Sequence, residues 1–170
     1  MIIRPPAIED RPAQPYAGIR TQVPMAELPT VIPQLLGQVF AGLARRGVPP
    51  DGPPFCRFHV IDMAGQMDVE MGVPVAAPLA DGEGLAAGQL PAGRYAVLTY
   101  VDVARGIEAN KALLDWGAAQ GLHWDQRETP AGDAFGGRYE SFLTGPADSP
   151  DPAHWQTEVA IRLADSSPRP

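Results

Sequence analysis

One short segment, residues 138–144, carries the residue types best suited to chemistry in this sequence. Its side chains alternate between apolar and polar, a pattern typical of a β-strand. Successive side chains of a strand point to opposite faces, so Glu140 shares a face with Arg138 and Phe142, while Tyr139 lies on the other face. A carboxylate at this position is either solvated on an open sheet face or held in a partly apolar cleft. In a cleft it would seek a cationic or hydrogen-bonding partner.

Two kinds of chemistry fit a carboxylate held among aromatic side chains. It can recognise a delocalised cation through its charge together with contact to the rings. It can also act as a general acid or base. For His59, in the strand-like segment 55–61, a structural histidine and a groove-lining histidine both remain open. Glu70 and Glu158 are expected to be solvated or salt-bridged, because both lie opposite apolar stripes.

Length and composition limit the number of domains and the class of protein. The chain has 170 residues, with 45% hydrophobic and 19% charged residues, which predicts one soluble globular domain. The net charge of −7, without a cluster of basic residues, argues against direct nucleic-acid binding. The single Cys56 fits a reducing cytosol. With no charged-then-apolar leader and no long apolar run, we expect a cytoplasmic protein that does not enter a membrane.

Hydrophobic periodicity divides the first half of the chain into four elements. Residues 1–15 are expected to form an extended, proline-rich lead-in, and residues 16–23 a strand. Apolar residues then recur at helical spacing from Leu28, which predicts an amphipathic helix that ends near Gly47. Two strands, 55–61 and 67–75, follow with a short connection between them, so we expect a hairpin.

The second half repeats this order after a Gly-rich linker at residues 77–92. A strand at 94–101 precedes a helix at about 104–120, and two strands follow at 137–144 and 155–163. The domain therefore contains two half-repeats, 14–76 and 93–164. We predict an α+β fold of two pseudo-symmetric β-α-β-β half-domains, with antiparallel sheets that enclose a central ligand groove, because one helix cannot cover both faces of three strands.

Short words of sequence align between the two halves. Tyr16 matches Tyr95, Glu70 matches Glu158, and the word Arg-Phe-His at 57–59 matches Arg-Tyr-Glu at 138–140. This alignment makes His59 the equivalent of Glu140. Tyr95 and Tyr100 differ in position by an odd number, so they are expected to face opposite sides of their strand.

Four segments, in order, resemble the GyrI-like, or AraC-effector-type, small-molecule-binding domain. They are residues 89–97, Trp116 with the following Gly121, residues 138–146, and residues 155–161. The resemblance covers the chain from about Tyr16 to Leu163 and implies two pseudo-symmetric units around a groove. It implies multidrug binding, that is, the binding of bulky lipophilic cations, with Glu140 as the acidic anchor. The walls are then expected to be Phe142, His59, Trp116, Trp155 and Tyr95.

The same resemblance bears on partners. Transcription regulators of this family carry a helix-turn-helix segment, which the residues before Tyr16 do not supply, so we expect no direct DNA binding by this chain alone. A sensor or sequestering protein, with a regulator partner or a homodimer, is then expected. Trp116 and Trp155 fit a core position as well as a groove wall.

An enzymatic alternative uses the same groove. Some members of this superfamily hydrolyse electrophilic cyclopropane-bearing genotoxins, and Glu140 would then be the catalytic base, with His59 or Tyr95 as proton donor. We expect no cofactor. We also expect no metal, because His123 and Asp125 lack a third ligand at a suitable spacing.

Overall fold

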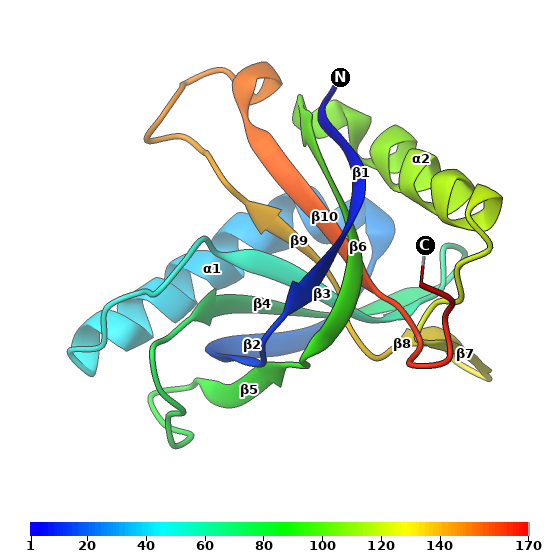
Figure 1. The fold of residues 1–170 in the computed structure, drawn as a ribbon. Helices are drawn as coiled ribbons and strands as arrows, with labels where there is room; N and C mark the ends of the chain where they lie inside the picture. The colour runs from blue at the N-terminus through cyan, green and yellow to red at the C-terminus, as the bar shows by residue number, and fades with distance from the viewer. Residues whose placement is uncertain (170) are drawn as a thin grey trace.

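The computed structural model describes residues 1–169 (Figure 1). Within them lie ten strands and two α-helices, α1 (Leu28–Arg45) and α2 (Gly106–Ala119). The strands are β1 (Ile2–Arg11), β2 (Gln14–Pro24), β3 (Phe55–Ile61), β4 (Gln66–Pro74), β5 (Ala86–Leu90), β6 (Gly93–Val101), β7 (Gln126–Thr129), β8 (Gly132–Phe135), β9 (Arg138–Phe142) and β10 (Gln156–Arg162).

The strands form one continuous antiparallel sheet in the order β1-β6-β10-β9-β3-β4-β2-β5, and the β7–β8 hairpin attaches to β3. The units β2-α1-β3-β4 and β6-α2-β9-β10 have the same topology, and β3 pairs with β9 at the centre. This confirms the predicted α+β fold of two half-domains. The two half-sheets are joined edge to edge into a single bent sheet (Figure 1).

Helix α1 begins and ends where its residues require. It starts at Leu28, with a proline in its first turn, where the missing N–H has no helical partner. Arg45 lies in the last turn, and Gly47 follows with a φ of 67°, the left-handed conformation that ends helices without a Cβ clash. Gly121 has the same role after α2, with a φ of 69°.

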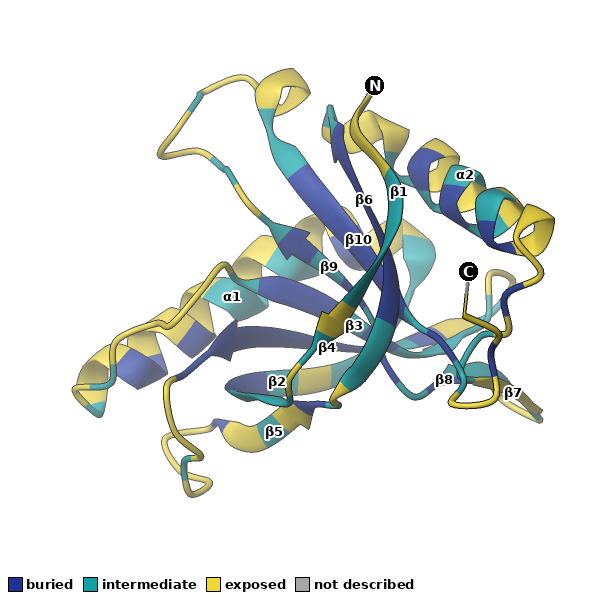
Figure 2. Ribbon diagram, viewed as in Figure 1, coloured by how far each residue is buried: buried dark blue, intermediate teal, exposed yellow. Residues whose placement is uncertain are grey.

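Both helices cover the same face of the sheet. Helix α1 packs Val39 and Leu43 against β2 and β4, while α2 packs Leu113 against β6 and β10. Figure 2 shows buried residues along the middle of β6, β10, β3 and β4, with the outer sides of both helices exposed. The opposite face of the sheet carries no helix in residues 1–169 and is covered by aromatic side chains instead.

The strand register corrects the predicted match of His59 with Glu140. Tyr16 pairs with Pro74 and Tyr95 pairs with Arg162, which is consistent with the match of Glu70 to Glu158. In the β3–β4 ladder Phe55 lies opposite Gly72, and in the β9–β10 ladder Tyr139 lies opposite Ala160. Because Gly72 corresponds to Ala160, Phe55 corresponds to Tyr139.

It follows that Cys56, and not His59, occupies the position equivalent to Glu140. The predicted alignment was three residues out of register on this strand. An odd shift moves a side chain to the opposite face of the sheet, so His59 and Glu140 face away from each other. The resemblance of the words Arg-Phe-His and Arg-Tyr-Glu is therefore not structural.

Three segments differ from the predicted elements. Residues 2–11, expected as a lead-in, form β1, which pairs with β6 at the edge of the sheet. The expected linker 77–92 contains β5, which pairs with β2. Residues 126–135 form the β7–β8 hairpin, for which no strands were predicted. In all three segments apolar and polar residues do not alternate clearly. They form strands because each can pair with a strand edge that the rest of the sheet leaves open. In residues 1–169 no helix has the length and hydropathy needed to cross a membrane.

Small residues lie beneath the aromatic rings of the helix-free face. A Cβ on Gly72 would come within 2.4 Å of Phe55 Cζ and 3.0 Å of Tyr16 Cδ2. The glycine therefore leaves the space above its Cα to these two rings. By contrast, Gly37 in α1 is exposed and has open space around its Cα.

We predict opposite effects of one substitution at these two glycines. Gly72→Ala displaces the rings from a packed site and should lower the free energy of unfolding by about 1–3 kcal/mol. Gly37→Ala should raise it by about 0.5–1 kcal/mol through helix propensity. Urea titration of both variants measures the two changes, and a neutral Gly72→Ala would contradict the packing described.

Candidate ligand-binding site

Four aromatic rings run across the helix-free face of the sheet, and we call this surface the aromatic face. Tyr16 and Phe55 have ring centroids 5.0 Å apart, Phe55 and Tyr139 are 5.7 Å apart, and Tyr139 and Tyr95 are also 5.7 Å apart. Each contact is edge-to-face, the arrangement that ring quadrupoles favour. The row spans both halves, since Phe55 and Tyr139 are equivalent residues on the two central strands.

A cavity of about 240 Å³ opens on this face. Aromatic rings and prolines form about half of its wall, and three charged residues reach it: Arg11, Asp51 and Glu158. Burial raises the pKa of Tyr95 and of Tyr139, so both hydroxyl groups stay neutral. The remaining lining residues are Pro12, Gln14, Gly52, Pro53, Phe55, Pro74, Leu90, Pro91, Tyr95, Tyr139, Ser141 and Leu143.

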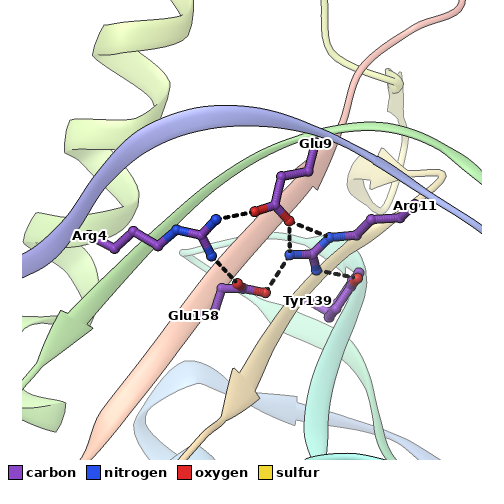
Figure 3. Close-up of polar contacts among 5 residues, drawn as sticks. All are labelled: Arg4, Glu9, Arg11, Tyr139 and Glu158. Atoms are coloured by element: carbon purple, nitrogen blue, oxygen red, sulfur yellow. Dashed lines mark hydrogen bonds and ion pairs between the residues drawn. The ribbon is translucent and has the colours of Figure 1, made fainter.

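Glu158 on β10 is the buried acid of this site. Its side chain is 11% exposed, and its Oε1 accepts a hydrogen bond of 2.7 Å from Arg11 Nη2. Arg4 Nη1 lies 3.7 Å from the other carboxylate oxygen. Both arginines also pair with Glu9, which makes a closed network of two cations and two anions (Figure 3).

Arg11 lies between this network and the rings. Its Cζ is 5.8 Å from the Tyr95 ring centroid and 6.0 Å from that of Tyr139, and Nη1 donates to the Tyr139 hydroxyl at 2.9 Å (Figure 3). Burial alone would lower the pKa of Arg11, but Tyr139, Glu9 and Glu158 together raise it. The guanidinium is therefore a permanent cation held beside aromatic rings.

The equivalent acid in the first half, Glu70, is satisfied differently. Tyr16 donates its hydroxyl hydrogen to Glu70 Oε1, and His59 Nε2 lies 2.8 Å from the same oxygen. Burial alone would raise the pKa of Glu70, but the hydrogen bonds from His59 and Tyr16, with the nearby charge of Arg57, lower it. Arg57 also donates to the Tyr16 hydroxyl at 3.1 Å, so the polar groups around Glu70 are paired with side chains of the same half-domain.

Glu140 lies on the helix-covered face. The side-chain amide of Asn110 on α2 donates to Glu140 Oε1 at 2.7 Å, and Arg138 Nη2 donates to Asn110 Oδ1 at 2.9 Å. The guanidinium of Arg138 stacks over the Phe135 ring at 4.7 Å. Burial raises the pKa of Glu140, although Asn110 and Arg138 act in the opposite direction. This arrangement joins α2 to the sheet.

Of the six residues expected at one groove, the structure places Tyr95 at the cavity and separates the others. His59 shares the aromatic face but is paired with Glu70. Phe142 packs against the cluster under α1, and Trp116 packs under α2. Trp155 precedes β10 and donates its indole N–H to Ser149 O at 2.8 Å. This separation follows from strand parity, because the side chains of Glu140 and Phe142 point to the face opposite to that of Tyr139.

The sequence contained one signal for the acid that does reach the cavity. Glu158 aligned with Glu70 in the repeat, and both lie on strands whose next residues are apolar and buried. Nothing in the sequence indicated Arg11, because residues 1–15 show no alternation of apolar and polar residues. Among residues 1–169 no group of three His, Cys, Asp or Glu side chains is arranged to hold a metal ion.

A comparison with protein families identifies the family of this chain. Residues 4–164 match the model of the GyrI-like small molecule binding domain. The chain belongs to the GyrI-like family. The fold of two half-domains described above is therefore that of a GyrI-like small molecule binding domain. None of the curated proteins matches the chain in sequence.

Solved structures share this GyrI-like fold at low sequence identity. The EcmrR C-terminal domain aligns at 19% identity with a TM-score of 0.69, over 95% of this chain and 98% of that one. In the EcmrR–DNA complex the values are 18% and 0.72, over 93% of this chain, which spans 56% of the EcmrR chain.

Two further structures have the same fold. A hydrolase from Listeria innocua aligns at 12% identity with a TM-score of 0.62, over 95% of this chain and 92% of that one. SAV2435 bound to tetraphenylphosphonium aligns at 10% identity with a TM-score of 0.56, over 94% of each chain. At these identities the likeness concerns the fold alone.

The pH dependence of stability tests the environment of Glu140. Its folded-state pKa is raised, so the stability contributed by the protonated carboxyl is complete below the unfolded-state pKa and is lost as the pH rises through the folded-state pKa. Glu140→Gln keeps the shape and stays neutral. We therefore expect the stability of this variant relative to the wild type to increase between about pH 4 and pH 7.

Urea titrations at several pH values measure this difference. Glu128→Gln, an exposed carboxylate on β7, is the matched control and should follow the wild type throughout. A constant difference between Glu140→Gln and the wild type across this range would contradict the assigned environment.

Proposed function

We propose that this domain binds bulky aromatic cations in the cavity of the aromatic face and acts as a sensor or sequestering domain. The observation that carries the proposal is the place of Glu158, a carboxylate with an 11% exposed side chain at the edge of a cavity walled by aromatic rings. A buried carboxylate together with ring faces attracts delocalised cations by charge and by the ring quadrupole. Glu158 is the anchor, and Tyr95, Tyr139 and Phe55 form the wall.

The charge around the cavity supports a cationic ligand. Glu158 and Asp51 are negative and Arg11 is positive, so the lining carries a formal charge of −1. The whole chain has a net charge of −7, which raises the local concentration of cations over anions. SAV2435 was solved with tetraphenylphosphonium, a bulky aromatic cation, and this supports the same ligand class here.

The relatives also suggest what binding is for. EcmrR was solved in a complex with DNA, and its C-terminal domain has the fold of this chain. We infer that ligand occupancy is the signal that this domain supplies, either to a regulator partner or by removing the ligand from solution.

Hydrolysis in the same cavity is the less supported function. The expected base, Glu140, lies on the helix-covered face and is bonded to Asn110. The Tyr95 hydroxyl donates to Pro91 O at 2.6 Å and so is already used within the protein. Glu158 Oε1 accepts a hydrogen bond from Arg11, so it too is already used within the protein.

Two isosteric ions of opposite charge test the proposed ligand class. Tetraphenylphosphonium and tetraphenylborate have nearly the same shape, so a difference in affinity reports charge. We expect tetraphenylphosphonium to bind with one site per chain and at least about tenfold more tightly than the anion, since about 1.4 kcal/mol of charge preference is modest for a buried carboxylate. Calorimetry measures both, and equal or tighter binding of the borate would overturn the proposal.

A second test separates the two candidate anchors. Glu158→Gln keeps shape and removes the charge at the cavity, so it should weaken tetraphenylphosphonium about tenfold. Glu140→Gln makes the same chemical change on the other face of the sheet and should leave the affinity within about twofold of the wild type. The reverse order of effects would assign the anchor to Glu140.

A further inference from the structure

The cation-binding position of the cavity is already filled by a side chain of the protein. Arg11 has every contact that a ligand cation would need: a 2.7 Å hydrogen bond to Glu158, a 2.9 Å bond to the Tyr139 hydroxyl, and two ring centroids at about 6 Å. Its side chain is 20% exposed, so the guanidinium lies in the site and not above it.

We propose that Arg11 is a tethered competitor that occupies the cation subsite, and that a ligand binds there by displacing it. This rests on the proposed function of the cavity and adds how the site is regulated. Arg11 thereby becomes a specificity-determining residue, since only cations that interact with Glu158 and the tyrosine rings better than a guanidinium does can enter.

Arg11 has a second partner for its charge when it leaves the subsite. Its Nε and Nη2 both donate to Glu9 Oε2, at 3.2 and 2.8 Å, and Glu9 is only two residues away on the same strand. The guanidinium can therefore lose Glu158 without becoming an unpaired buried charge, which would otherwise be costly. The hydrogen bonds from Arg11 and the charges of Arg11 and Arg4 lower the pKa of Glu9, although burial acts in the opposite direction, so this partner stays charged.

The size of the cavity also supports the displacement of Arg11 by a ligand. Pockets for drug-sized ligands usually have volumes of about 300–1,000 Å³. The cavity here has about 240 Å³ with Arg11 forming part of its wall. Withdrawal of that side chain enlarges the site toward the range that a bulky cation needs.

The two halves of the fold show that Arg11 is an addition to the repeat. Glu70, the equivalent of Glu158, is satisfied by Tyr16 and His59 from within its own half. Glu158 is instead satisfied from β1, a strand that belongs to neither β-α-β-β unit and pairs only with β6 at the sheet edge. The partner of Glu158 is therefore held by the less embedded element.

The test compares two arginine variants with the same charge change. Arg11→Gln removes the competitor, whereas Arg4→Gln removes a neighbouring cation whose side chain is 53% exposed and 3.7 Å from Glu158. We expect Arg11→Gln to bind tetraphenylphosphonium about tenfold or more tighter than the wild type, and Arg4→Gln to differ by less than about threefold. Thermal unfolding checks that both variants are folded.

The outcomes separate the inference from the function on which it rests. If the wild type binds the cation and Arg11→Gln binds it equally or more weakly, or if Arg4→Gln gains as much, the competitor is refuted and the binding function stands. If neither the wild type nor Arg11→Gln binds, both fail.

A readout on the wild-type protein does not depend on any variant being stable. The Arg11 Nε–H resonance, assigned by its loss in Arg11→Lys, should shift when the protein is saturated with tetraphenylphosphonium. Saturation without a shift of this resonance would also overturn the competitor.

Discussion

The pairing of β3 with β9 is the contact on which the remaining structure depends. Each half-domain has three strands of its repeat and one helix, and the helix covers one face of those strands. Hydrogen bonds across this central pair make one sheet out of two, with Cys56 opposite Glu140. The same pairing brings Phe55 beside Tyr139 on the uncovered face. The aromatic row, and with it the cavity, therefore exists only because the two halves share an edge.

The sequence predicted those elements whose cause is local. Helix α1 was predicted from its apolar spacing and its terminal residues, and the repeat from the order of elements. Strand register is not a local property, because it is set by the partner strand that a segment meets. An error of three residues placed His59 and Glu140 on the same face of the sheet, whereas they lie on opposite faces. Strand β1 was not predicted, because an edge strand pairs with one neighbour and does not need an apolar stripe that the sequence would reveal. The acid at the cavity was visible only as the repeat partner of Glu70.

Two equivalent buried acids have different surroundings in the two halves of the fold. A buried carboxylate must be compensated, and Glu70 and Glu158 receive different compensation in the same geometry. Tyr16 and His59, side chains of the same half-domain, contact Glu70 and fix it as a structural group. A mobile type of side chain, an arginine on a long aliphatic stem, compensates Glu158. The symmetry of the backbone thus does not extend to the chemistry of the side chains.

A competitor that is part of the chain has an effective concentration fixed by its covalent attachment and not by the solution. Diluting the protein or changing its expression does not alter how strongly Arg11 opposes a ligand. The domain would therefore respond at the same free ligand concentration in a sparse or a crowded population of molecules. Cations that bind weakly would not displace Arg11 even when they are abundant, while a tightly binding aromatic cation would displace it.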